Sequence, residues 1–250
     1  MAMRYPEICI NTGVISKNTE TVVKLCADKG IRVWGVTKGV SAHPAVASAM
    51  LEGGCQGLAD SRVDNIRKLR LFGFNNPMML LRIPMPGEMD EVAETADSCL
   101  ISMPGSVLML DSACREAGTE VGIIVMVDLG DLREGIWPDG VEEMAEAIRQ
   151  CRRVRYLGVG SNLGCLSGVL PTEKNLSLLV RTGEELSSFL ECPLGVVSGG
   201  ATSTLMLVEK GIVPEGVNQL PVLDPEGQVS GMISRDQLIT FLTERTRLQV

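Results

Sequence analysis

Lys38 is the residue of this chain whose surroundings best suit covalent chemistry. It follows directly on an apolar segment, residues 33–37. Burial and neighbouring cations lower the pKa of a lysine and expose a neutral amine, which can form an imine with an aldehyde. The alternative is a surface lysine whose aliphatic stem packs on the strand while its ammonium group reaches solvent. Lys38 is therefore a candidate nucleophile whose role depends on its neighbours.

A stretch rich in serine, glycine and threonine, residues 198–204, is a candidate phosphate site. It ends one apolar segment and opens a predicted helix. Small residues let the backbone approach an anion, hydroxyl groups donate to it, and a helix N-terminus adds positive potential. The residues that we expect to contribute are Ser198, Gly199, Gly200, Thr202 and Ser203. The alternative is an ordinary turn followed by a helix cap.

Further polar residues follow apolar segments in the same way. Arg62, Arg82 and Arg133 are candidates for binding a substrate carboxylate or an anionic cofactor oxygen, because guanidinium groups pair bidentately with carboxylates. Ordinary ion pairs would explain any one of them equally well. His43 is expected to cap or pack rather than catalyse. The other polar residues in such positions are Asp60, Ser61, Asp128, Ser161 and Asn162.

The elements that must position these residues are short apolar segments that alternate with longer amphipathic ones. Strands are predicted at residues 7–11, 31–37, 56–59, 78–82, 99–102, 121–128, 156–160, 194–198 and 216–220, and helices include residues 19–29, 141–152 and 176–190. Counted from the strand that ends at Lys38, about eight β/α units follow, which predicts an α/β fold of the TIM-type (β/α)8 barrel class. A doubly wound open sheet is less favoured, because no glycine-rich phosphate turn follows an early strand.

A barrel would bring the candidate residues to one face, because the loops after the carboxyl ends of its strands converge there. Late phosphate loops are also a recurrent feature of barrels, which favours the functional interpretation of residues 198–204.

Composition excludes several functions. The net charge of -8 and the pI near 4.9 argue against nucleic acid or an anionic membrane as partner. No signal peptide or apolar run of about 20 residues is visible, so a cytoplasmic location is expected. The 8 cysteines are scattered and are expected to be buried, reduced thiols. With one histidine and no clustered ligands, no metal site is predicted.

Several ordered blocks carry a resemblance to a known family. They are residues 35–39 (GVTKG), 58–62 (LADSR), 80–85 (LLRIPM), 127–135 (VDLGDLREG), 158–165 (GVGSNLGC) and 197–200 (VSGG). In these blocks the chain resembles an ornithine racemase-type member of the alanine racemase N-terminal-domain superfamily, the barrel class of pyridoxal 5'-phosphate (PLP) enzymes. The resemblance extends from about residue 5 to residue 220.

The resemblance implies PLP as the cofactor and Lys38 as the residue that carries it as a Schiff base. Arg133 would lie near the ring oxygen of PLP, Asn162 would also bind the cofactor, and residues 198–203 would hold its phosphate. Arg62 and Arg82 would bind a small amino-acid substrate. The implied activity is racemisation of ornithine or a similar basic amino acid, in which Lys38 removes the Cα proton. A homodimer is left open.

Residues 1–220 are predicted to form this PLP-binding barrel, and residues 221–250 a short strand and helix appendix. Racemases of this group continue into a β-rich second domain that supplies a tyrosine acid/base, and this chain stops too early for that domain. The tail instead resembles half of a CBS motif and is expected to close or cover the barrel. Two alternatives stay open: a non-catalytic PLP-binding homeostasis protein, and a chain that its altered C-terminus leaves inactive.

Overall fold

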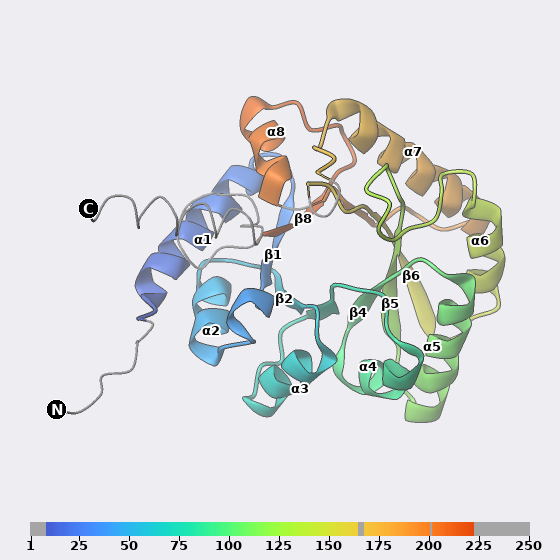
Figure 1. The fold of residues 1–250 in the computed structure, drawn as a ribbon, viewed down its shortest axis with the longest axis horizontal. Helices are drawn as coiled ribbons and strands as arrows, with labels where there is room; N and C mark the ends of the chain where they lie inside the picture. Colours follow the sequence, from blue (N-terminus) through green and yellow to red (C-terminus); the bar gives the residue numbers. More distant parts are fainter. Residues whose placement is uncertain (1–8, 165–167, 201, 223–250) are drawn as a thin grey trace, which may run out of the picture.

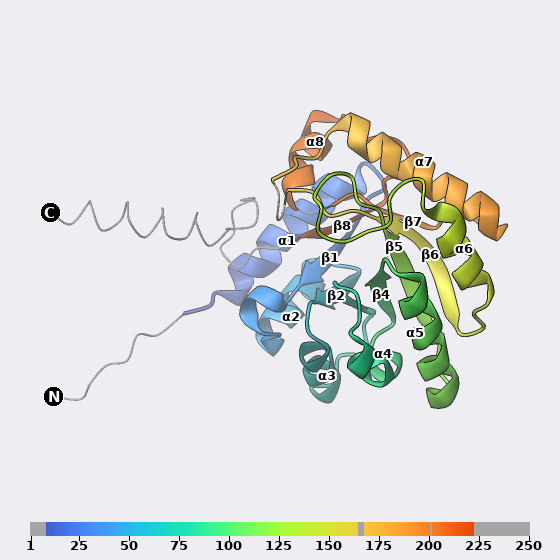
Figure 2. The same ribbon diagram turned by 45° about the vertical axis from the view of Figure 1, so that its right-hand side comes forward.

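Eight parallel strands form a closed barrel with helices around it (Figures 1 and 2). The computed structural model describes residues 9–164, 168–200 and 202–222. The strands are β1 (Arg32–Val36), β2 (Gly57–Asp60), β3 (Met78–Leu80), β4 (Ser98–Ile101), β5 (Val121–Met126), β6 (Val154–Gly160), β7 (Val196–Ser198) and β8 (Gln219–Val222). They pair in sequence order, and β8 closes the barrel on β1.

Helices follow the strands on the outside of the barrel. The α-helices are α1 (Thr12–Ala27), α2 (Pro44–Glu52), α3 (Val63–Leu71), α4 (Met89–Thr95), α5 (Pro104–Ala117), α6 (Val141–Arg149), α7 (Glu173–Leu190) and α8 (Leu205–Lys210). Three short 3-10 helices lie in loops: η1 (Lys38–Val40), η2 (Pro86–Glu88) and η3 (Thr202–Thr204). The prediction of a (β/α) barrel is therefore confirmed, and each strand predicted between residues 31 and 220 overlaps an observed one.

The N-terminal prediction is wrong for the residues that can be compared. The described part of the strand predicted at residues 7–11 forms no strand, and Asn11 instead caps α1, since its Oδ1 accepts a hydrogen bond from the Val14 backbone N–H at 3.1 Å. Helix α1 thus begins at Thr12, seven residues before the predicted start at Thr19. Its first turns carry one fully covered apolar residue, Ile15, so the periodic apolar signal becomes clear only further along the helix.

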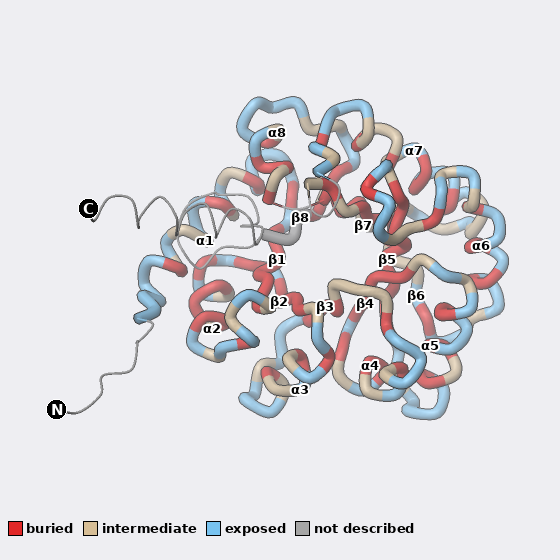
Figure 3. Tube along the Cα trace, viewed as in Figure 1, coloured by how far each residue is buried: buried red, intermediate tan, exposed pale blue. Residues whose placement is uncertain are grey.

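The core has two layers, because successive strand residues face opposite sides of the sheet. In β1, Val33 packs against helices, whereas Trp34 faces the inside of the barrel. The buried inner cluster contains strand residues only: Trp34, Val36, Ala59, Met79, Leu100, Ile124 and Met126. Figure 3 shows the barrel strands as a largely buried ring, with exposed residues on the outer helices and loops. The barrel interior is therefore a packed core and not a pore.

Glycines make room for two side chains of the inner layer, Trp34 and Leu157. A Cβ atom at position 57 would lie 2.6 Å from the Trp34 ring, and one at position 122 would lie 2.4 Å from Leu157. The inner wall can therefore hold Trp34 and Leu157 only because the neighbouring strands have no side chain there.

Strand β8 differs from its predicted position. A strand was predicted at residues 216–220, but β8 runs to Val222 and pairs with β1 along its length. The predicted division of the chain between residues 220 and 221 thus falls inside β8, and the rest of the tail lies outside the described residues. Toward β7 the ladder has one residue pair, and Asn218 supplements it: its Oδ1 accepts from the Val197 N–H at 3.0 Å.

Among the residues that the structure describes, no helix is long and apolar enough to cross a membrane. Within the same residues, no group of three or more His, Cys, Asp or Glu side chains is placed to hold a metal ion. The cytoplasmic location stays a prediction.

The cysteine thiols within the described ranges are free. Cys26, Cys55, Cys99 and Cys114 are buried, as predicted for most cysteines of the chain, and Cys9 is exposed. Burial raises the pKa of the Cys26 thiol to about 11 and that of the Cys55 thiol to about 12. These two thiols are therefore protonated packing residues rather than nucleophiles.

Candidate active site at the mouth of the barrel

The loops that follow the carboxyl ends of the strands form the mouth of the barrel, and the predicted site residues lie in them. Lys38 follows β1 and begins η1. Its side chain is half-buried, and no ion pair joins it to any carboxylate within the described ranges. The turn behind it is tight: Ser41 and Ala42 both have positive φ values, of 48° and 52°. The backbone at Lys38 is thus fixed by local geometry.

The wall beside Lys38 is held together by a buried carboxylate. Asp60, which ends β2 and is 1% exposed, accepts a hydrogen bond from the Thr37 hydroxyl at 2.7 Å. It also accepts from the Arg62 backbone N–H at 3.0 Å and from the Asn65 side-chain amide at 2.9 Å. These bonds tie the residue before Lys38 to the loop after β2. Asp60 therefore supports the site instead of facing a ligand.

Arg82, at the same wall, forms hydrogen bonds with other protein groups. Its guanidinium donates to both oxygens of Glu88, at 2.6 and 2.7 Å, and to the Ser61 carbonyl at 2.7 Å. The hydrogen bonds from Arg82 lower the pKa of the Glu88 carboxyl and outweigh the opposing effect of burial. A substrate carboxylate would have to compete with Glu88, so substrate binding by Arg82 stays a prediction. Arg62 has an exposed side chain, and its predicted role is equally untested.

The opposite wall begins with the loop after β5. Asp128 Oδ1 accepts from the backbone N–H groups of Gly130 and Leu132, at 2.8 and 3.2 Å. The loop then returns to β5, where the Ile136 N–H donates to the Met126 carbonyl at 2.8 Å and the Asp128 N–H donates to the Ile136 carbonyl at 2.9 Å. Gly135 has a φ of 138° at this return. Arg133 therefore projects from a loop that is fixed at both ends.

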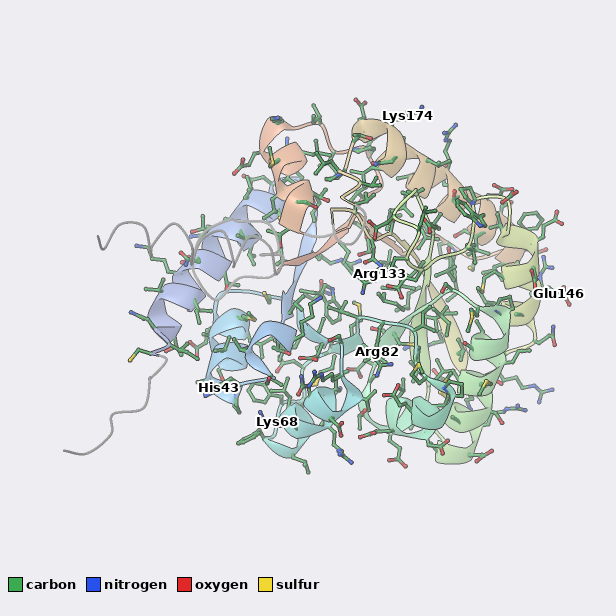
Figure 4. All side chains as sticks on the ribbon, viewed as in Figure 1. His43, Lys68, Arg82, Arg133, Glu146 and Lys174 are labelled. Atoms are coloured by element: carbon green, nitrogen blue, oxygen red, sulfur yellow. The ribbon has the colours of Figure 1, made fainter. Side chains whose placement is uncertain are left out.

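Two of the predicted cofactor residues meet at one carboxylate. Glu134 Oε1 accepts a hydrogen bond from Asn162 Nδ2 at 2.6 Å and lies 3.8 Å from Arg133 Nε. In Figure 4, Arg133 and Arg82 lie over the middle of the barrel, whereas His43, Lys68, Glu146 and Lys174 lie at its outer edge. His43 is the N-cap residue of α2, and its side chain makes no capping bond and is exposed.

The candidate phosphate residues lie at the end of β7. Ser198, Gly199, Gly200 and Thr202 are all buried, and η3 begins at Thr202. Gly200 has a φ of 103°, and a Cβ atom there would lie 3.1 Å from the Thr204 hydroxyl. Thr204 in turn donates to the Gly199 carbonyl at 2.7 Å. The turn is thus fixed by its own hydrogen bonds, and the Gly199 N–H donates to the Gln219 carbonyl at 3.0 Å.

Ser161, at the neighbouring end of β6, has a buried hydroxyl. The residue is 3% exposed, and its Oγ has no hydrogen-bond partner within the part of the chain that the structure describes. Its backbone N–H donates to the Ser198 carbonyl at 3.2 Å, which places it beside the predicted phosphate turn. Because buried polar groups are almost always paired, this hydroxyl is a candidate donor to a ligand at the turn.

The contacts of two residues in this region, Glu134 and Asp60, could not be predicted from the sequence. Asp60 is a polar residue at a predicted strand end and Glu134 follows Arg133, but no pattern in the sequence shows which side chains they reach. Their partners come from other loops: Asn162 for Glu134, and Thr37 for Asp60. Only the folded arrangement reveals these contacts.

The arrangement defines a class: an α/β barrel whose mouth combines an amine, an arginine and a turn of small residues. Comparison with known proteins places the chain within that class. The family described as "Alanine racemase, N-terminal domain" matches residues 10–213. The chain belongs to this family.

Two curated relatives are similar over most of the chain. Lysine racemase of Thermotoga maritima is 36% identical over 98% of this chain and 68% of its own length. Ornithine racemase of Acetoanaerobium sticklandii is 33% identical over 87% of this chain and 62% of its own length. The chain therefore spans about two thirds of the length of these relatives.

Solved structures show the same fold at lower identity. Alanine racemase of Clostridium difficile 630, in complex with cycloserine, superposes with a TM-score of 0.72 at 16% identity, over 91% of this chain and 62% of that chain. D-threo-3-hydroxyaspartate dehydratase of Delftia sp. HT23 gives a TM-score of 0.67 at 17% identity, over 85% of this chain and 58% of that chain. At these identities the likeness concerns the fold alone.

Proposed function

We propose that this protein is a PLP-dependent racemase of basic amino acids such as ornithine, with Lys38 as the residue that carries the cofactor as a Schiff base. The observation that supports it best is the pair of walls at the barrel mouth: Lys38 on one side, and the buried Ser161 hydroxyl beside the Ser198–Gly200 turn on the other. The two relatives at 36% and 33% identity are a lysine and an ornithine racemase, which supports the substrate class.

The residues at the second wall fit the phosphate of PLP. The Ser161 hydroxyl is a buried donor without a partner among the described residues, and a phosphate oxygen would satisfy it. The bare backbone at Gly199 and Gly200 allows an anion to approach closely. Ser198 is a further predicted contributor at this turn, whereas the Ser203 hydroxyl donates to the Leu163 carbonyl at 3.1 Å and would have to give up that bond to reach a phosphate. In this proposal Arg133 faces the ring oxygen of the cofactor, and Asn162 lies beside it.

Lys38 has a second task in the proposed reaction. When bound, PLP acts as an electron sink that makes the α-proton of an attached amino acid acidic. In the proposed reaction the Lys38 amine would be the base that accepts this proton at Nζ. Inversion requires a proton donor on the opposite face.

The charge of the loop after β5 supports a substrate with a second ammonium group. Asp128, Asp131 and Glu134 lie in a stretch of seven residues, 128–134, in which Arg133 is the one basic residue. The excess of negative charge favours a cationic side chain at the mouth, because opposite charges attract more strongly where solvent is partly excluded. An amino acid with a neutral side chain gains no binding free energy from this negative charge.

We also propose that the protein forms a homodimer through the mouth of the barrel. Large apolar side chains are exposed on the loops after β4, β5 and β6, among them Met103, Leu132, Trp137 and Leu170. Exposed apolar patches of this kind mark surfaces that are covered in the functional state. Light scattering of the purified protein tests the proposal: twice the monomer mass supports it, and a monomer at micromolar concentration contradicts it.

The function is tested by adding PLP to the purified protein and recording the visible absorbance of the wild type and of Lys38→Ala. We expect a bound-cofactor band in the wild type that Lys38→Ala lacks and that Lys174→Ala, at the outer edge of α7, retains. Loss of optical rotation of L-ornithine then measures racemisation. A band without racemisation would instead support the non-catalytic PLP-binding protein. The absence of a band would contradict both.

A further inference from the structure

Glu134 is the residue of the mouth whose contacts join two loops. It lies in the loop after β5, between Leu132 with a φ of 52° and Gly135 with a φ of 138°. A Cβ atom at position 135 would lie 2.4 Å from the Asp128 backbone nitrogen, so the backbone passes there without room for a side chain. The position of Glu134 is therefore fixed by its own loop.

The carboxylate of Glu134 is largely covered, with 12% of its side chain exposed. One of its oxygens, Oε1, accepts from Asn162 Nδ2 at 2.6 Å and faces Arg133 Nε at 3.8 Å. Asn162 comes from the loop after β6, so this one oxygen joins side chains of two loops. Both side chains are predicted to bind the cofactor, but Glu134 itself has no role in that prediction.

We infer that Glu134 is a positioning residue, which fixes the Asn162 amide and the Arg133 guanidinium in the orientation in which they meet the cofactor. This inference rests on the proposed function. An ionised carboxylate only accepts hydrogen bonds, so it compels Asn162 to present Nδ2 and leaves the amide oxygen free to face elsewhere. A glutamine at position 134 could accept or donate and would not enforce that orientation.

The charge of Glu134 has a second effect. It lies beside the Arg133 guanidinium and partly offsets its positive potential at the mouth. Removal of the carboxylate charge makes the potential around Arg133 more positive, which disfavours any further positive charge nearby. A proton on the nitrogen that joins Lys38 to the cofactor is such a charge. The pH at which the absorbance of the bound cofactor changes therefore reports on Glu134.

The test uses Glu134→Gln and Glu134→Asp in the full chain, with Glu91→Gln as the matched control. Glu91 also contacts an arginine, with Oε1 at 3.1 Å from Arg67 Nε, but its helix α4 lies on the outside of the barrel. The measurements are the Kd of PLP by absorbance titration and the pH midpoint of the bound cofactor. For Glu134→Gln we expect an affinity about tenfold weaker and a midpoint about half a pH unit lower.

Glu134→Asp keeps the charge and should restore the midpoint more fully than the affinity, while Glu91→Gln should change neither. In the double variant with Asn162→Ala, the loss of affinity should be smaller than the product of the two single losses, since both changes break one contact. The inference would be overturned if Glu134→Gln kept the wild-type Kd of PLP and the wild-type pH midpoint. It would also be overturned if the loss of affinity in the double variant equalled the product of the two single losses. Failure of the proposed function is distinct, because the wild type itself would then show no Lys38-dependent band.

Discussion

The two walls of the barrel mouth differ in how their polar groups are satisfied. On the wall formed after β1, β2 and β3, the charged side chains are satisfied by protein groups: Asp60 accepts from Thr37 and Asn65, and Arg82 pairs with Glu88. On the wall formed after β5, β6 and β7, the Ser161 hydroxyl is buried without a partner among the described residues. The first wall is therefore a hydrogen-bonded scaffold beside Lys38, and in the proposed function the second wall is the one that would bind the phosphate.

The largest expected effect is on the scaffold wall. Asp60→Ala would leave three donors without their acceptor, and we expect the free energy of unfolding to fall by about 3 kcal/mol. Denaturant titration measures it. The matched control is Asp64→Ala, whose exposed carboxylate contacts Arg67 at 2.7 Å and whose loss should cost less than about 0.5 kcal/mol. Equal losses in the two variants would show that Asp60 is not a scaffold residue.

Gly135→Ala tests the rigidity of the opposite wall. The new Cβ atom would lie 2.4 Å from the Asp128 nitrogen and 2.7 Å from the Val127 carbonyl carbon, and backbone atoms cannot move aside easily. We expect a loss of about 2 kcal/mol in unfolding free energy, from strain at a φ of 138° and from the clash. Thermal melts of both variants measure the difference. Gly105→Ala, in α5 with open space around it, should leave the stability unchanged. A neutral Gly135→Ala would mean that the loop adapts freely.

Two hydroxyl deletions contrast the walls directly. Thr37→Val removes a donor to Asp60 and should lower the unfolding free energy by about 1 to 2 kcal/mol. Ser161→Ala removes a hydroxyl that no described residue pairs with, so stability should be unchanged, while the Kd of PLP should rise about tenfold. A Ser161→Ala variant that loses stability but binds PLP normally would reverse the assignment of the two walls.

The smallest expected effect concerns the pH dependence of the Arg82–Glu88 pair. Because the pKa of Glu88 is lower in the folded protein than in the unfolded chain, the pair stabilises the fold above about pH 4.3, the ordinary value. The contribution disappears as the pH falls through the folded-state pKa. Glu88→Gln should thus cost about 0.5 kcal/mol at pH 7, reduced by its partial exposure, and nothing at pH 2. A cost that does not change with pH would exclude an electrostatic origin.

The sequence predicted much of this arrangement because apolar segments and the polar residues after them are local signals. Lys38, Arg133 and Ser198 each follow a predicted strand, and the barrel topology then brings strand ends to one face. The same signals could not reveal the start of α1, where polar residues surround Ile15. Nor could they reveal that Pro221 lies within β8, since a proline ordinarily indicates the end of a strand.

The contacts of Glu134 and Asp60 were beyond prediction for a different reason. They depend on the packing of loops that are distant in sequence, such as residue 134 against residue 162. The sequence gives no measure of the distance between two loop side chains.

The central claim is that Lys38 carries the cofactor across the mouth to the Ser161 wall. Its most direct test is borohydride reduction of the PLP-loaded protein followed by peptide mapping in a mass spectrometer. We expect the phosphopyridoxyl group on Lys38, with its yield reduced in Ser161→Ala at limiting PLP. A label on Lys68 or Lys174 in place of Lys38 would contradict the account.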